Sequence, residues 1–126
     1  RRASQLPVAT ICCYPASKAF AQAHADAILT AWRNGGSPER PRVLFSAHGL
    51  PQRVIDRGDP YQWQVEQTAA AVRDLLPQEW DSVVCYQSRV GPLKWLGPST
   101  EAEVRRAGRE PMRLDSSTSI GVAADQ

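Results

Sequence analysis

His48 is the residue of this sequence best suited to chemistry. It follows an apolar run, residues 43–45, and stands between the small residues Ala47 and Gly49. An imidazole has a pKa close to neutrality, so it can accept a proton or bind a metal ion at physiological pH. The alternative is a histidine that only makes a hydrogen bond at the end of a strand. From the local pattern both interpretations stay open.

Two polar residues and a large aromatic residue form a second group. Gln87 and Ser88 follow another apolar run, residues 83–86, and both side chains can donate and accept hydrogen bonds. Trp95 comes seven residues later, in a segment rich in glycine and proline. A rigid indole in a loop offers a flat ligand a large stacking surface. A tryptophan that caps the core is the alternative.

Tyr61 and two arginines complete the candidate residues. Tyr61 stands at the expected start of a helix, where its hydroxyl could meet a ligand carboxylate or a water molecule. Arg57 and Arg89 have the planar guanidinium geometry that suits carboxylates, although arginine is also a common surface residue. Asp59 is better suited to cap the helix than to catalyse.

These residues need a scaffold, and the hydrophobic pattern predicts one. Apolar runs bounded by proline or polar residues predict strands at residues 8–14, 43–45 and 83–86. Apolar residues at helical spacing predict helices over residues 17–33, 60–76 and 100–108, the last opened by a capping box formed by Thr100 and Glu103. Strand and helix alternate three times, which is typical of a parallel α/β fold with flanking helices.

The two longest connections are expected to carry function. Residues 49–60 and 87–99 are rich in glycine and proline and follow predicted strands. In parallel sheets ligands bind beyond the carboxyl ends of the strands. His48, Gln87 and Ser88 are therefore expected to meet at one edge of the sheet.

Composition sets limits on the remaining classes. The chain has 126 residues, enough for one domain, and a net charge of +2 without a long block of like charge, so no nucleic-acid partner is expected. No apolar run approaches the roughly 18 residues of a membrane span, and a cytoplasmic location is the default. Residue 1 is arginine and the only methionine is Met112, so the chain is expected to begin inside a longer protein.

The other distinctive residues receive structural assignments. The three cysteines lie in apolar runs without a Cys-x-x-Cys spacing, so reduced, buried thiols are expected. Trp32, Trp63 and Trp80 are expected to pack in the core or an interface. His24 is expected on the surface, without a role. Residues 110–126 are polar and are expected to form a poorly ordered tail.

Three blocks of this sequence resemble the ferrochelatase family, in the family's order. They are residues 44–51 (LFSAHGLP), residues 57–61 (RGDPY) and residues 87–98 (QSRVGPLKWLGP). The last block is long and compositionally unusual, which makes the resemblance specific. It covers residues 8–109, so residues 1–109 are interpreted as part of the C-terminal α/β domain of such an enzyme and residues 110–126 as a non-matching tail.

The resemblance implies a fold, a reaction and a set of site residues. The fold would be chelatase-like, a Rossmann-type three-layer α/β arrangement in truncated form. The reaction would be insertion of ferrous iron into protoporphyrin IX or coproporphyrin in heme biosynthesis, which makes the enzyme a lyase. His48 matches the family's active-site histidine and would act as base or iron ligand. Residues expected to contact the porphyrin are Tyr61, Gln87, Ser88, Trp95 and Arg57.

Several points remain alternatives at this stage. Iron is expected as substrate and no cofactor as a permanent component, while an iron–sulfur cluster elsewhere in the parent protein and peripheral membrane association are left open. The family's second active-site histidine and glutamate have no counterpart here, so the chain alone is expected to be inactive and to need the missing parts of its parent. The alternatives are a non-catalytic domain that binds porphyrin or metal, and a related cobalt chelatase, against which residues 87–98 argue.

Overall fold

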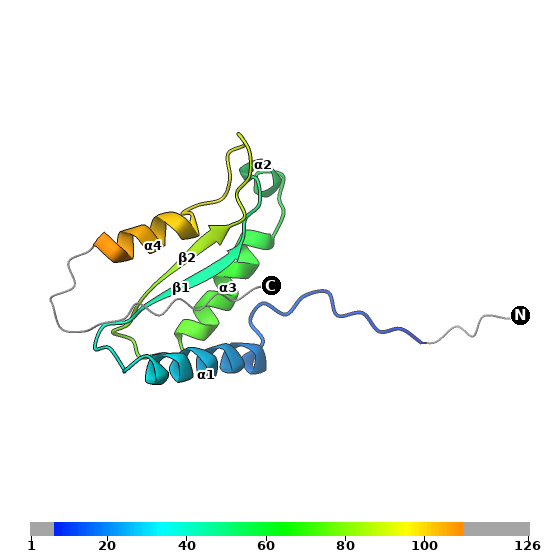
Figure 1. The fold of residues 1–126 in the computed structure, drawn as a ribbon. Helices are drawn as coiled ribbons and strands as arrows, with labels where there is room; N and C mark the ends of the chain where they lie inside the picture. The colour runs from blue at the N-terminus through cyan, green and yellow to red at the C-terminus, as the bar shows by residue number, and fades with distance from the viewer. Residues whose placement is uncertain (1–6, 110–126) are drawn as a thin grey trace, which may run out of the picture.

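The computed structural model describes residues 7–109, which form a small two-stranded sheet between helices. The helices are α1 (Lys18–Asn34), α2 (Gln52–Ile55), α3 (Tyr61–Arg73) and α4 (Thr100–Arg109), and the strands are β1 (Arg42–His48) and β2 (Asp81–Gln87). Figure 1 shows α1 and α3 on one side of the strands and α4 on the other. The parallel α/β fold expected from the sequence is confirmed.

The two strands run parallel, and they are paired so that their first residues and their last residues lie opposite each other. Arg42 pairs with Asp81 at the start, and His48 pairs with Gln87 at the end. Parallel neighbours need a long crossover, which α3 supplies here. Both strands therefore finish at the same edge of the sheet, and the residues that follow them begin side by side.

The sheet and the helices enclose two hydrophobic clusters. The first joins Ala25 and Ile28 of α1, Val43 of β1 and Val72 of α3, with Trp80 packed against it. Trp80 also contacts Trp32, with ring centroids 5.2 Å apart, which confirms a packing role for that pair. The buried residues of α1 lie three or four positions apart, so they occupy the face of the helix that is turned toward the core.

The second hydrophobic cluster lies beneath the edge where the strands end. It consists of Ala47, Val65, Tyr86 and Leu96, which come from β1, α3, β2 and the loop after β2. Leu96 is 2% exposed, although it belongs to a long loop. Its burial anchors that loop to the domain, because a buried leucine side chain contributes about 2 kcal/mol relative to an exposed one.

The segment before α1 differs from the sequence-based expectation. Residues 8–14 were expected to form a strand, but in the structure they have no strand partner among the described residues and lead away from the sheet (Figure 1). Val8 is 86% and Ile11 78% exposed, and Cys12 and Cys13 are exposed rather than buried. A β-branched run favours a strand only when a neighbouring strand completes its hydrogen bonds. Only Cys85 fits the buried thiol expected.

Smaller differences concern helix ends. The segment 49–60 was expected to be all loop, but it contains the four-residue helix α2. Helix α3 was expected to extend to residue 76, but it ends at Arg73 and is followed by a turn at residues 74–75. Trp63 on α3 is 56% exposed, so the packing role expected for it is not realised among the described residues. The expectation for residues 110–126 lies outside the described residues.

Two side-chain caps can be compared with the sequence analysis. Asp59 Oδ1 accepts a 2.9 Å hydrogen bond from the backbone N–H of Tyr61, so its side chain caps the start of α3 as expected, although Pro60 is the residue that directly precedes the helix. The capping box expected at Thr100 is wrong, because Ser99 Oγ accepts the hydrogen bond from the Ala102 N–H at 3.1 Å. Thr100 is the first helical residue, and its side chain is turned toward the sheet.

Helices long and apolar enough to cross a bilayer are not found within residues 7–109.

Candidate active site

The candidate site lies at the edge of the sheet where β1 and β2 end. His48 is the last residue of β1 and is exposed, and its register partner Gln87 is half-buried at the end of β2. The N–H of Gly49 donates a 2.8 Å hydrogen bond to the carbonyl of Gln87. The structure therefore brings together His48 and Gln87, as expected from their positions at strand ends.

Gly49 allows a close approach between the two chain segments. A Cβ atom at this position would lie 2.6 Å from the carbonyl oxygen of Gln87 and 3.5 Å from Cε3 of Trp95. The first distance is too short for a real contact, so a side chain here would displace the backbone. The second distance is an ordinary van der Waals contact, so the indole of Trp95 lies beside the residue that follows His48. Trp95 and His48 thus share one end of the domain.

Backbone hydrogen bonds hold the two loops against each other. The N–H of Leu96 donates to the carbonyl of Leu50 at 3.0 Å, and the N–H of Gln52 donates to the carbonyl of Lys94 at 2.8 Å. Pro51 and Trp95 form an antiparallel bridge between these bonds. The two connections, which the sequence pattern presents as separate loops, form one unit around Trp95 in the structure.

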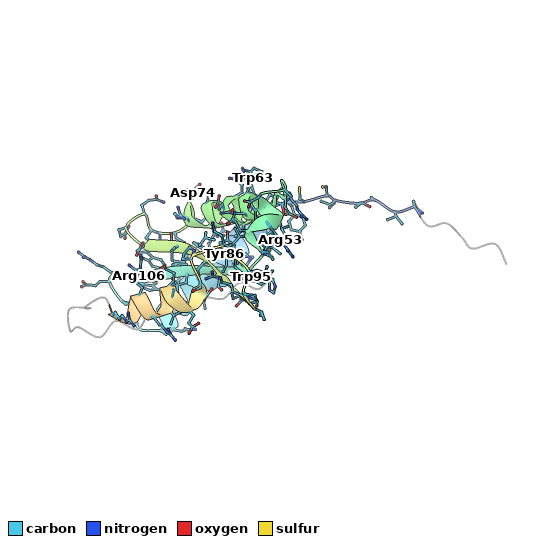
Figure 2. The ribbon with its side chains drawn as sticks, turned by 90° about the horizontal axis from the view of Figure 1, so that it is seen from above. Arg53, Trp63, Asp74, Tyr86, Trp95 and Arg106 are labelled. Atoms are coloured by element: carbon cyan, nitrogen blue, oxygen red, sulfur yellow. The ribbon has the colours of Figure 1, made fainter. Side chains whose placement is uncertain are left out.

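The indole of Trp95 is only partly buried, but its polar atom is covered. Nε1 is buried and has no hydrogen-bond partner among the described residues. Figure 2 shows Trp95 at the same end of the domain as Arg53, with Arg106 of α4 toward the opposite end. An indole N–H is a donor only, so an acceptor would satisfy it.

Tyr61 contacts the histidine through the backbone. Its hydroxyl donates a 3.0 Å hydrogen bond to the carbonyl oxygen of His48. Burial raises the pKa of this phenol, which therefore remains protonated at neutral pH and can keep donating. The sequence analysis expected the hydroxyl to meet a ligand carboxylate or water. In the structure it supports the end of β1, and its contact with a ligand stays a prediction.

Four basic residues lie in the two connections that begin at this edge of the sheet. Arg53 and Arg57 follow β1, and Arg89 and Lys94 follow β2; all four are exposed. Their side chains make no hydrogen bond or ion pair within residues 7–109. Sequence reasoning named Arg57 and Arg89 but missed Arg53 and Lys94. Their location in the two paired loops could have suggested them only if that pairing had been known.

Ser88 and the distribution of metal ligands complete the site. Ser88 follows Gln87 directly, is exposed, and has a left-handed backbone with φ of 58°. This conformation turns the chain sharply away from β2.

Within the described part of the chain, no three His, Cys, Asp or Glu side chains are grouped closely enough to hold a metal ion.

Comparison with known proteins identifies the family of this chain. The family model described as Ferrochelatase matches residues 1–125. The chain belongs to the ferrochelatase family. The matched range includes residues 110–125, which the sequence analysis assigned to a non-matching tail.

Curated relatives in this family match most of the chain. A ferrochelatase of Phenylobacterium zucineum (strain HLK1) is 59% identical over 101 residues, which cover 80% of this chain and 29% of that protein. A ferrochelatase of Caulobacter vibrioides (strain NA1000 / CB15N) has the same identity and coverage. A ferrochelatase of Rickettsia bellii (strain OSU 85-389) is 49% identical over 106 residues, 83% of this chain and 29% of that protein. The chain thus spans less than a third of the length of these relatives.

Proposed function

We propose that this chain contributes the His48 side of a site that inserts ferrous iron into a porphyrin. One observation supports the proposal most directly. The indole of Trp95 lies within van der Waals reach of the position next to His48, in a chain that belongs to the ferrochelatase family. An imidazole and a large aromatic ring at one edge of a parallel sheet suit a flat nitrogen macrocycle.

The reaction defines what the site must do. A free-base porphyrin carries two pyrrole N–H protons, and the ferrous ion replaces both, so each turnover releases two protons and an iron porphyrin whose metallated core carries no net charge. The ring nitrogens must face both the incoming metal and a proton acceptor. His48 is exposed at the strand end, where it can reach such a ring. Its neutral imidazole can accept a proton or act as a transient iron ligand, and both roles are compatible with this position.

The neighbouring side chains have complementary tasks in this proposal. Trp95 provides a surface for the macrocycle, and Gln87 and Ser88 provide hydrogen-bonding groups beside His48. Tyr61 holds the His48 carbonyl, and thereby the direction in which the imidazole leaves the strand. Iron passes through the site as a substrate, which fits a site with one imidazole better than a site with a closed set of ligands.

The basic residues suit the acidic side chains of a porphyrin. Protoporphyrin and coproporphyrin both carry carboxylates, and guanidinium groups bind carboxylates in a bidentate manner. Arg53, Arg57, Arg89 and Lys94 are exposed and have no acidic partner among the described residues. In this proposal Arg57 and its neighbours attract the carboxylates while the ring lies against Trp95.

A titration of a porphyrin with the 126-residue chain tests the binding part of the proposal. We expect a shift of the Soret band that saturates, and we expect Trp95→Ala to weaken binding at least about tenfold, the loss of one good aromatic contact. Trp63→Ala is the matched control, because Trp63 is exposed on α3. Equal weakening by both variants, or no spectral change with the unaltered chain, would contradict this assignment of the site.

Metal insertion tests the catalytic part. Ferrous iron or zinc is added to the chain with bound porphyrin in the presence of the other parts of the parent enzyme, and metalloporphyrin formation is followed by absorbance. His48→Ala is expected to abolish any insertion above the uncatalysed rate, whereas His24→Ala, which changes the only other histidine, is expected to preserve it. Porphyrin binding with no insertion under any of these conditions would favour the non-catalytic binding role.

A further inference from the structure

A small buried network of hydroxyl and thiol groups lies between the sheet and α4. Ser46 Oγ and Thr100 Oγ1 are 2.8 Å apart, and Thr100 Oγ1 lies 3.4 Å from the Sγ atom of Cys85. Ser46 is 5% exposed and Cys85 is completely buried. Ser46 stands two residues before His48 in β1, and Cys85 stands two residues before Gln87 in β2. Thr100 therefore bonds to both strands just below the candidate site.

The hydroxyl of Thr100 is free to make these bonds because another residue caps the helix. Ser99 Oγ accepts the hydrogen bond from the Ala102 N–H, which is the usual task of the capping side chain. Thr100 can therefore point toward the sheet. A buried hydroxyl bonded to two strands is costly to replace by an apolar group, since its partners would lose their hydrogen bonds.

Thr100 also marks the point where the long loop after β2 ends. That loop contains Trp95, and its last residues return to the sheet. The N–H of Tyr86 donates to the carbonyl of Pro98 at 2.9 Å, and Tyr86 forms a parallel bridge with Ser99. The hydrogen bond between the side chains of Thr100 and Ser46 joins this end of the loop to β1.

We propose that Thr100 is a positioning residue for Trp95. Its hydrogen bond to Ser46 determines where the loop closes over the end of β1, and thereby where the indole lies relative to His48. Leu96 transmits the constraint, because it is buried beneath the site and its N–H bonds to the carbonyl of Leu50. The inference concerns the geometry of the loop, and its consequence for porphyrin binding rests on the proposed function.

The test compares Thr100→Val with Thr100→Ser by NMR on the 126-residue chain. Valine retains the shape of threonine and removes the hydroxyl, and serine retains the hydroxyl. The four tryptophan indole N–H signals are resolved in a proton–nitrogen correlation spectrum, and the Trp95→Phe variant identifies the signal of Trp95. Hydrogen exchange of the Leu96 amide is measured on the same samples, with amides of the β1–β2 ladder as internal reference.

In Thr100→Val we expect the Trp95 indole signal to shift and the Leu96 amide to exchange about tenfold faster relative to the ladder amides, the effect of losing one buried hydrogen bond. In Thr100→Ser both are expected to stay near their original values. A Trp95 signal and a Leu96 exchange rate unchanged in Thr100→Val would overturn the inference. So would an equal acceleration of Leu96 and ladder amides, because that pattern indicates a general loss of stability.

If Thr100→Val does not fold, Ser46→Ala removes the same hydrogen bond from the side of β1 and leaves the contact of Thr100 with Cys85. The same shift of the Trp95 signal is then expected, and its absence would contradict the inference. Porphyrin titration of the folded variants separates the two proposals. A displaced Trp95 signal in a protein whose unaltered form binds no porphyrin would support the positioning role and contradict the proposed function.

Discussion

The hydroxyl of Tyr61 donates a 3.0 Å hydrogen bond to the backbone carbonyl of His48. The first residue of α3 is thereby joined to the last residue of β1, across a connection that contains α2. This bond orients the end of the strand without using the imidazole, so the histidine side chain stays available for a ligand.

Replacing Tyr61 by phenylalanine removes this bond and preserves the ring. We expect the free energy of unfolding to fall by about 1 kcal/mol, the usual net contribution of one hydrogen bond. Urea denaturation followed by circular dichroism measures it. Tyr14→Phe is the control, because Tyr14 is exposed and contacts Phe20 only through its ring. An equal effect of the two substitutions would contradict the role assigned to the Tyr61 hydroxyl.

Tyr86 is expected to respond in the opposite direction. Its hydroxyl is buried and has no hydrogen-bond partner among the described residues. Tyr86→Phe removes an unsatisfied polar group, so we expect the free energy of unfolding at pH 7 to stay unchanged or to rise by up to about 1 kcal/mol. A loss comparable with that of Tyr61→Phe would show that the phenol has a bonding partner in solution.

The same residue predicts a pH dependence at the alkaline end. Burial raises the pKa of Tyr86 to about 12, with the nearby Glu66 carboxylate contributing in the same direction. An unfolded tyrosine ionises near pH 10, so above that pH the unfolded state releases its proton first and is favoured. The stability contributed by this group is complete below about pH 10 and is lost as the pH rises toward 12. Denaturation midpoints measured across this range should fall more steeply for the unaltered chain than for Tyr86→Phe, and parallel curves would argue against a buried phenol.

Asp59 is expected to stabilise α3 as its cap. Asp59→Ala removes the acceptor for the Tyr61 N–H, and we expect a loss of about 1 kcal/mol in the free energy of unfolding. Glu79→Ala removes a carboxylate of equal charge that is exposed and makes no hydrogen bond in the described chain, so it serves as the control. Thermal unfolding of both variants distinguishes a cap from a general effect of charge, which would change both alike.

The three cysteines are expected to divide into two classes of reactivity. Cys12 and Cys13 are exposed, whereas Cys85 is buried. A thiol reagent such as dithionitrobenzoate should label two thiols rapidly in the folded chain and the third only after unfolding. Burial raises the pKa of Cys85, which lowers its thiolate fraction further and slows its reaction. Slow labelling of all three thiols in the folded chain would indicate that residues 8–14 are covered in solution.

Local sequence patterns predicted much of the scaffold. The helical spacing of Val65, Ala69 and Val72 identified α3, and the apolar runs ending at His48 and at Gln87 identified β1 and β2. Their assignment to a shared sheet edge followed from the parallel class, in which every strand ends on the same side. Such properties depend on residues within a few positions of one another, so the sequence alone determined them.

Contacts between distant residues were decided only by the tertiary structure. The run at residues 8–14 has the composition of a strand but no partner strand, and pairing is a property of two segments rather than one. The Thr100 hydroxyl bonds to Ser46, which lies 54 positions earlier, instead of capping its own helix. Likewise, the placement of Trp95 beside Gly49 requires two loops to pair along their backbones. The residue types at this edge could be read from the sequence, but their distances arise from packing, because long-range contacts form only when the whole chain has folded around them.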